Sequence, residues 1–256
     1  MAVPAMKIVR KALLFAAGRG KRLGDLTAHT PKPLLEVAGA PIIAHILEAL
    51  AVAGVEEAIV VTGYLAEQVE NFCARFAVEH APLSVRTVRQ PSLNGTGGAL
   101  LAAIPLIGDE ERFLLGWGDV LMDREFYGRF AKQARIAEYD LLLSVNRTRD
   151  PYRGAAVYVD SEMRVTRIVE KPAPGTSTTN WNNAGLFAAT PRLLDCVRRL
   201  APSARGEIEL PAAIAAMVED GLMVRAVELR GFWSDIGTPE DLALARNAFR
   251  PRRADR

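Results

Sequence analysis

The sequence has few cysteines, little net charge and no long apolar run. Cys73 and Cys196 are the only cysteines in 256 residues, and they form neither a CxxC motif nor a zinc-binding pattern with the three histidines. Each lies in an apolar, helix-like segment, which predicts two buried thiols in a reducing compartment. A disulfide framework and a zinc site are therefore disfavoured.

The charge and hydropathy patterns limit where in the cell the protein is expected and which classes of partner it is expected to bind. The net charge is only +2, so no overall field draws the chain to nucleic acid or to a membrane surface. No apolar run reaches the length of about 18 residues that a transmembrane helix needs, and the first residues lack the apolar core of a signal peptide. We therefore expect a cytoplasmic protein that binds neither nucleic acid nor membrane.

The length and composition fit one large domain. Half of the residues are hydrophobic, which provides ample material for a core. Residues 251–256 differ because they form a short basic tail, so the predicted domain covers residues 1–250. Hexapeptide repeats, the pattern of a left-handed β-helix, do not occur in the sequence.

Apolar strands and helix-like segments alternate along the first 145 residues, which predicts a mostly parallel α/β sheet covered by helices on both faces. From about Gly154 the pattern changes to strands that look antiparallel, followed by helices. The expected strands are 12–16, 58–62, 83–88, 112–117, 140–145, 155–159, 164–170, 183–189 and 223–229. The expected helices are 41–52, 64–76, 99–106, 123–135, 191–200, 207–220 and 238–248.

A glycine-rich basic turn follows the first strand. Gly18 and Gly20 let the backbone approach a ligand, and Arg22 adds positive charge beside them. Lys32 lies between two prolines, which stiffen its loop. Fixed cations facing a glycine turn are suited to a polyphosphate. The turn is not a Walker A motif, and Leu23 occupies the third glycine position of a dinucleotide fingerprint, so an NAD-binding Rossmann enzyme is disfavoured.

The string AAGxGxRL…PKPLL…GxP resembles the N-terminal motif of the sugar-1-phosphate nucleotidylyltransferases, and further matching motifs extend to about residue 242. The resemblance implies a Rossmann-like, glycosyltransferase-A-like fold. It divides the domain into a nucleotide-binding half at about 7–150 and a smaller, antiparallel sugar-binding half at about 151–235. It also implies that Ala16, Ala17, Gly18 and Gly20 bind the nucleotide, with the N–H groups near Gly18 and Gly20 on its terminal phosphates.

Two aspartates are the candidate metal ligands. Asp119 follows an apolar strand, and in a parallel sheet ligands gather where strands end. Asp235 lies in a WSDIGT string that resembles a family motif, and Thr238 already supplies the cap of the following helix. The resemblance makes both aspartates Mg²⁺ ligands, with the substrate phosphates completing the shell. Trp117 departs from the family pattern, which often has Asn at that position.

Further motifs imply contacts to the sugar and to the base. By the resemblance, Lys171 contacts the sugar phosphate, and Glu170, Gly154 and Asn183 contact the sugar. The base is expected at a loop that contains Gln90, Gly95 and Thr96. A glutamine amide offers one donor and one acceptor to the imide edge of uracil or thymine. A GEIEL string at 206–210 also favours UTP or dTTP.

The predicted reaction joins an NTP and a sugar 1-phosphate into an NDP-sugar and pyrophosphate. Arg22, Lys32 and Lys171 are the predicted catalytic residues, because alignment and charge neutralisation are what the reaction needs. The alternatives are guanylyl transfer to mannose or heptose 1-phosphate, uridylyl transfer to N-acetylmuramate 1-phosphate, and a non-catalytic sensor of nucleotide sugars. The sugar is not determined by the sequence, and a homo-oligomer remains open.

Overall fold

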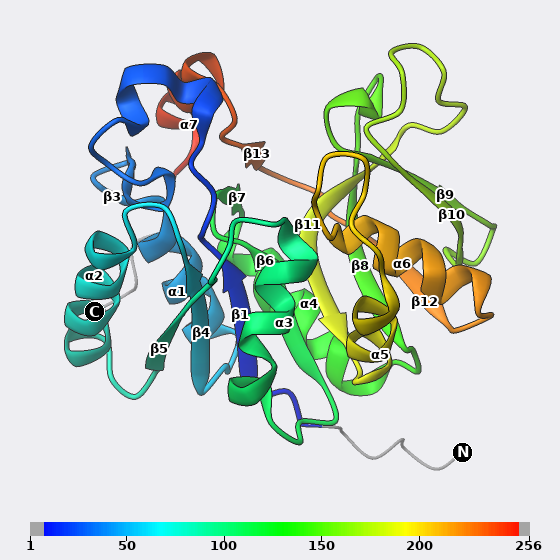
Figure 1. Cartoon of the computed structure of the whole chain (residues 1–256), viewed down its shortest axis with the longest axis horizontal. Helices are drawn as coiled ribbons and strands as arrows, with labels where there is room; N and C mark the ends of the chain where they lie inside the picture. Colours follow the sequence, from blue (N-terminus) through cyan, green and yellow to red (C-terminus); the bar gives the residue numbers. More distant parts are fainter. Residues whose placement is uncertain (1–7, 251–256) are drawn as a thin grey trace.

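The computed structural model describes residues 8–250, so the basic tail at 251–256 lies outside the described residues. A nine-stranded sheet runs through the middle of the molecule, in the order β10-β9-β11-β6-β1-β4-β5, with β8 and β12 attached beyond β11 (Figure 1). Its strands are β1 (Lys11–Phe15), β4 (Glu57–Thr62), β5 (Ser84–Arg89), β6 (Phe113–Trp117), β8 (Leu141–Arg147), β9 (Ala155–Val159), β10 (Val165–Glu170), β11 (Trp181–Ala189) and β12 (Val224–Glu228).

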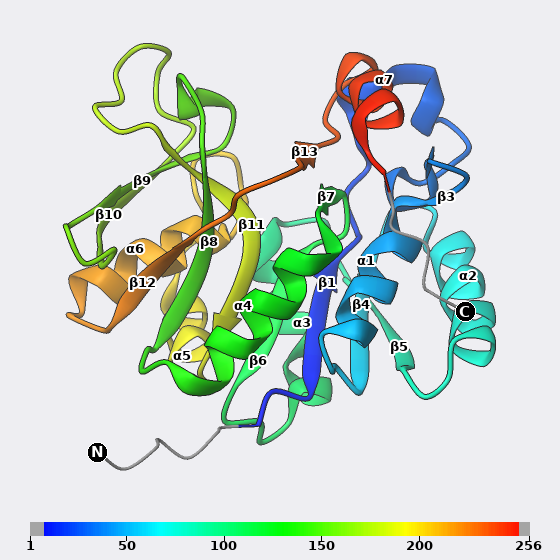
Figure 2. The same ribbon diagram turned by 180° about the vertical axis from the view of Figure 1, so that it is seen from behind.

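Helices cover both faces of the sheet. Successive residues of β1 point to opposite faces, so Leu14 belongs to the core under one set of helices and Leu13 to the core under the other. The helices α1, α2 and α4 cover the face behind the sheet in Figure 1 and in front of it in Figure 2, and α3, α5 and α6 cover the other. Their bounds are α1 (Ile42–Val52), α2 (Ala66–Glu79), α3 (Thr96–Ile107), α4 (Arg124–Ile136), α5 (Arg192–Arg199) and α6 (Leu210–Glu219). Among the described residues, none of the helices has the length and apolar character needed to cross a bilayer.

The expected α/β architecture is confirmed, and the structure adds the order of the strands. The strands β5, β4, β1 and β6 pair in parallel as predicted. The next strand in the chain, β8, does not pair with β6, because β11 lies antiparallel between them. The two halves expected from the motifs therefore share one continuous sheet.

The strand β11 forks this sheet. One of its edges pairs with β8. On the opposite edge, Asn182 pairs with Ala156 of β9, whereas residues 186–189 pair with β6. The pairing with β8 shifts in register between Asn183 and Phe187, where Gly185 has φ 94°. Because β9 and β6 leave β11 at different points, the sheet opens between them.

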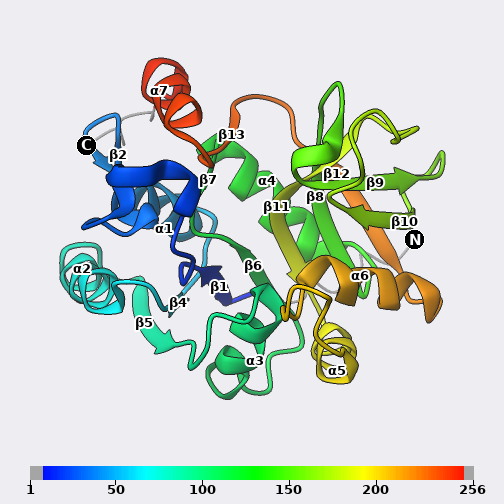
Figure 3. The same cartoon turned by 45° about the horizontal axis from the view of Figure 1, so that its top comes forward.

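Several short elements were not expected from the sequence, and some of them carry residues that line the cleft described below. A two-stranded ribbon of β7 and β13 pairs Asp235 with Val120. The described residues contain three 3-10 helices: η1 follows Gly20, η2 follows Pro31, and η3 begins with Pro151. The helix α7, the last in the described part of the chain, contacts η1 (Figure 3). The unexpected elements are β2 (Glu36–Val37), β3 (Ala40–Pro41), β7 (Val120–Met122), β13 (Trp233–Asp235), η1 (Lys21–Thr27), η2 (Lys32–Leu34) and η3 (Pro151–Arg153). The helix α7 (Pro239–Ala248) confirms the helix expected at 238–248.

Candidate active site

A cleft of about 620 Å³ lies in the fork between β6 and β9. It gathers eight of the residues that the sequence predicted for the site, from segments up to 213 residues apart. These residues are Arg22, Lys32, Asp119, Gly154, Glu170, Lys171, Asn183 and Asp235. The other predicted residues, which were assigned to the nucleotide, do not line this cleft.

The turn after β1 presents unpaired backbone donors. Within residues 8–250, no acceptor meets the N–H groups of Gly18, Arg19 or Gly20. Gly18 is exposed, and a Cβ added at this position would meet no atom within 4 Å. Ala16 and Ala17 are buried beneath this turn, where the Ala17 carbonyl accepts a hydrogen bond from Tyr64. Successive free N–H groups suit an anion, and the contact of this turn with the triphosphate stays a prediction.

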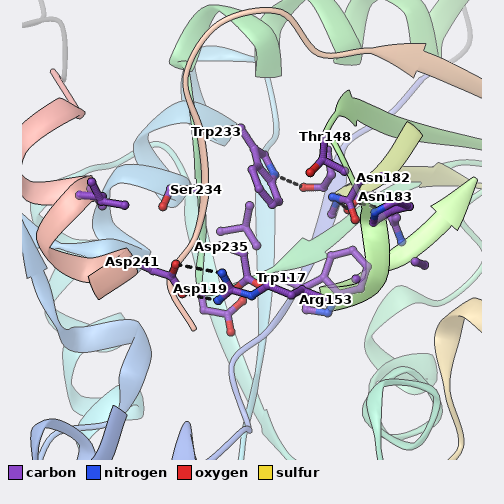
Figure 4. Close-up of a pocket in the computed structure, with 18 of the residues that line it drawn as sticks. Trp117, Asp119, Thr148, Arg153, Asn182, Asn183, Trp233, Ser234, Asp235 and Asp241 are labelled. Carbon is purple, nitrogen blue, oxygen red and sulfur yellow. Dashed lines mark hydrogen bonds and ion pairs between the residues drawn. The ribbon is translucent and has the colours of Figure 1, made fainter. Parts of the chain in front are cut away.

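The two candidate metal ligands meet at one lysine. Asp119 precedes β7 and Asp235 ends β13, and the pairing of these short strands brings both carboxylates to the same wall of the cleft (Figure 4). The Lys32 Nζ lies 2.5 Å from Asp119 Oδ2 and 3.6 Å from Asp235 Oδ1. The Lys32 side chain is only 8 % exposed, so its ammonium is committed to this pair.

The charged groups of this cluster shift one another's pKa values. Burial by itself would lower the pKa of Lys32, but the Asp119 and Asp235 carboxylates outweigh it and raise that pKa above its ordinary value. Burial and the adjacent Asp119 carboxylate raise the pKa of Asp235. Two carboxylates held this close need positive charge between them. Oxygen donors of this kind fit Mg²⁺, which keeps several positions for water or phosphate oxygens.

Arg22 adds a second cation on the side of the cleft where Lys32 lies. Its guanidinium lies against Gly237, where a Cβ would stand 2.9 Å from Arg22 Nη2, so a side chain there would displace the guanidinium. Gly237 is two residues from Asp235, which places a second cation beside the acidic pair. The predicted catalytic cations Arg22 and Lys32 are therefore neighbours, although η1 and an extended turn separate them in the chain.

On the other side of the cleft, a strained turn presents Glu170 and Lys171 together. Successive residues of a strand normally point to opposite faces. Lys171 has φ 41°, a left-handed conformation that is uncommon for a residue other than glycine, and its N–H donates to the Gly154 carbonyl at 2.7 Å. The turn ends the strand alternation, so both side chains line the cleft, with Nζ 3.2 Å from Glu170 Oε1. Such strain is typical of functional sites.

The structure explains the unusual tryptophan at position 117. Its ring packs on Phe187 with a centroid separation of 4.9 Å, and a Cβ on Gly185 would lie 2.5 Å from the ring. Trp117 thus forms the floor where β6 meets β11. The neighbouring Asn183 lines the cleft as predicted, while its Oδ1 accepts a hydrogen bond from Gly185 N–H at 3.1 Å.

The predicted base-binding loop packs against the GEIEL string. Thr96 Oγ1 accepts a hydrogen bond from Leu210 N–H, and Gly97 N–H donates to Ile208 O. A Cβ on Gly95 would lie 2.5 Å from Ile208 O. These bonds hold residues 207–209 out of a helix, so the helix expected at 207–220 begins only at Leu210.

Gln90 does not offer the donor that the sequence prediction assigned to it. Its Nε2 already donates to Asn94 Oδ1 and to Gly95 O, at 2.9 and 3.0 Å. No described residue donates to its Oε1, which stays in contact with solvent. Gln90 therefore presents an acceptor only. The Gly95 N–H has no acceptor in the described part of the chain and is the available donor.

The sequence motifs did not single out an ion pair that crosses the cleft. Arg153 Nη2 in η3 lies 2.8 Å from Asp241 Oδ2 at the start of α7 (Figure 4). Burial opposes the ionisation of Asp241, but Arg153 lowers its pKa below the ordinary value. Arg153 directly precedes the predicted Gly154, and Asp241 lies in the helix expected at 238–248, yet only the tertiary structure shows that the two residues join the two sides.

Comparison with known proteins gives relatives over almost the whole chain. Residues 11–250 match the family described as Nucleotidyl transferase. The bifunctional protein GlmU of Methanococcus maripaludis strain S2 is 32 % identical over 238 residues, covering 93 % of this chain and 54 % of the relative. The mannose-1-phosphate guanylyltransferase catalytic subunit beta of Danio rerio is 33 % identical over 233 residues, covering 90 % of this chain and 62 % of the relative.

A solved structure shares the fold. The crystal structure of UDP-glucose pyrophosphorylase complexed with UDP-glucose superposes with a TM-score of 0.83 at 21 % identity, covering 94 % of this chain and 98 % of the other. The chain spans about half the length of the GlmU relatives that it matches. The resemblance seen in the motifs is confirmed, and the chain belongs to the nucleotidyl transferase family.

Proposed function

We propose that this protein transfers a nucleotidyl group from an NTP, with UTP or dTTP favoured, to a sugar 1-phosphate. One observation carries the proposal: a single cleft collects cations and carboxylates from both halves of the sheet. Arg22 and Lys32 lie on one side of this cleft and Lys171 lies on the other. The turn with free N–H groups after β1 leads directly into η1, which carries Arg22. Two anionic reactants need such an arrangement to come together.

In the proposed reaction, a phosphate oxygen of the sugar 1-phosphate forms a bond to the α-phosphorus of the NTP. The bond from that phosphorus to the oxygen bridging to the β-phosphorus breaks, and pyrophosphate leaves with that oxygen. The second pKa of a phosphate monoester is about 6, so the nucleophile is already a dianion at neutral pH. No general base is needed, and the protein supplies alignment and charge neutralisation.

Each cation has a separate role in this proposal. Arg22 and the N–H groups of Gly18 and Gly20 hold the terminal phosphates, which become the leaving pyrophosphate. Lys171 steers the sugar phosphate. Removing one donor of this kind typically costs about 10²–10³ in rate. Asp119 and Asp235 would hold Mg²⁺, which supplies positive charge to the phosphates when bound. Lys32, which neutralises these aspartates in the structure, then becomes available to a phosphate.

The base preference rests on Gln90 and Gly95. An acceptor at Gln90 Oε1 beside a donor at Gly95 N–H matches the N3–H and carbonyl of uracil or thymine. The same pattern matches the N1–H and O6 of guanine, and the Danio rerio relative is named a guanylyltransferase, so GTP is the second candidate. Adenine and cytosine have a ring acceptor in place of that N–H, so they pair with Gln90 Oε1 only if the base shifts to bring its amino group there. We expect both to be poorer substrates than a base with the ring N–H.

The test is a matrix of ATP, CTP, GTP, UTP and dTTP against a panel of sugar 1-phosphates, scored by pyrophosphate release. We expect release that depends on both substrates, with UTP or dTTP best. Asp235→Asn is the matched control, since it keeps the shape of the side chain but removes its charge, and it should lose activity while remaining folded. Binding of a nucleotide sugar without pyrophosphate release from any pair would favour a sensor over an enzyme.

A further inference from the structure

Asn182, one residue before the predicted sugar-binding Asn183, is built into the fork of β11. Its side chain lines the cleft, and only 5 % of the residue is exposed. It stands at the register position where β11 pairs with β8 on one edge and with β9 on the other. The resemblance pointed to Asn183 as a sugar contact and not to Asn182.

The orientation of the Asn182 amide is fixed by its donors. Nδ2 donates to Asn146 Oδ1 and to the Asn183 carbonyl, both at 2.9 Å. Both acceptors lack a proton to give, so the amide nitrogen must face them. Asn146 is itself only 9 % exposed and lies directly opposite on β8. The carbonyl oxygen of Asn182 therefore points the other way.

That oxygen faces Gly154, in the sugar half of the cleft. A Cβ at position 154 would lie 2.4 Å from Asn182 Oδ1, so Gly154 is required for the asparagine to occupy this place. No described residue donates a hydrogen bond to Oδ1, and the atom still contacts solvent. Figure 4 shows Asn182 beside Asn183 and Thr148, away from Asp241.

We infer that Asn182 Oδ1 accepts a hydrogen bond from a hydroxyl or amide N–H of the sugar and thereby selects the sugar 1-phosphate. The inference rests on the proposed function. An immobilised acceptor without a protein donor stays unpaired when the ligand lacks a donor at that place. Discrimination then comes from rejecting the analogue that has lost one hydroxyl or N–H. Glu170, a charged acceptor next to Lys171, reads a different position.

The experiment measures kcat/KM for the best sugar 1-phosphate and for each of its monodeoxy analogues. Some analogues will be poor substrates because they lack the hydroxyl that Glu170 contacts. In the wild-type enzyme, one further analogue should have a kcat/KM about 10- to 100-fold below that of the parent sugar, the effect of leaving a buried polar group unpaired. In Asn182→Ala, that analogue and the parent sugar should agree within about threefold. Glu170→Gln is the matched control, because it should weaken the discrimination against a different analogue.

Positioning is tested through the partner amide. Asn146→Ala frees the Asn182 amide to turn, so the same analogue should be rejected less strongly while the KM for the NTP stays unchanged. Melting curves check that each variant is folded, and Asn182→Ser replaces Asn182→Ala if the latter is not.

Three results would overturn the inference: no analogue rejected by the wild type except those assigned to Glu170, rejection that persists in a folded Asn182 variant, or an equal loss for every sugar. In each case transfer to the parent sugar would still proceed, so the proposed function would stand. Failure of the proposed function would instead appear as no transfer to any sugar.

Discussion

Replacing Lys32 tests whether Asp119 and Asp235 form a shared cation site. Lys32→Met keeps the buried stem but removes the ammonium that lies within 4 Å of both carboxylates. Breaking a buried ion pair typically costs about 3–5 kcal/mol. The side chains of Asp119 and Asp235 are 26 % and 41 % exposed, so water recovers part of this cost. We expect a loss of about 2–3 kcal/mol in the free energy of unfolding.

The assay is thermal unfolding followed by circular dichroism, first in EDTA and then in millimolar Mg²⁺. For a chain of this size, the expected loss lowers the melting temperature by about 4–12 °C in EDTA. Mg²⁺ should raise the melting temperature of Lys32→Met more than that of the wild type. The ion binds the folded state and does not have to compete with the lysine in the variant.

Lys171→Met is the matched control for this experiment. Lys171 pairs with Glu170, but its side chain is 51 % exposed, so its loss should change stability by no more than about 1 kcal/mol. Its response to Mg²⁺ should equal that of the wild type. The reasoning fails if Lys32→Met is as stable as the wild type in EDTA, or if Mg²⁺ stabilises both proteins equally.

Three other predictions concern single groups. Thr238 Oγ1 accepts the Asp241 N–H at the start of α7, so Thr238→Ala should lose about 1 kcal/mol in urea unfolding and Thr238→Ser much less; equal losses would contradict the cap. Burial raises the pKa of Glu170 against the opposing effect of Lys171. The carboxylate is therefore protonated at a higher pH than usual, so kcat/KM for the sugar 1-phosphate should fall on the acid side more steeply than protonation of the sugar phosphate alone explains. A pH profile of Glu170→Gln should keep only the fall that comes from the sugar phosphate, whose second pKa is about 6. Burial also raises the pKa of Cys73 to about 12, so in a Cys196→Ser background iodoacetamide at pH 9 should label it only after denaturation, as mass spectrometry would show.

Local sequence patterns predicted the parts of the site that depend on neighbouring residues. The apolar run 12–16 and the glycines after it predicted a buried strand and a turn with free N–H groups, and the structure has both. The string from Thr238 predicted α7 and its cap. The motif resemblance predicted eight residues that now line one cleft. These features are determined locally, because caps, turns and strand alternation depend on a few adjacent residues.

The order of the strands was decided by the tertiary structure. The sequence predicted each strand near its place, but β11 enters between β6 and β8, from a position more than 60 residues beyond β6. The apolar pattern of a strand indicates which of its residues face the core, but it does not indicate which other strand will pair with it in the sheet. The fork that opens the cleft could therefore not be read from the sequence.

The direction of individual polar groups also depended on the folded molecule. The sequence by itself determined that Gln90, Lys32 and Asp235 are present in motifs suited to a nucleotide and a metal. Only the tertiary structure decided that both donors of Gln90 are taken, that Lys32 joins the two aspartates, and that Asn182 points at Gly154. The physical reason is that a side-chain donor or acceptor is free only in relation to its spatial neighbours, and those come from distant segments.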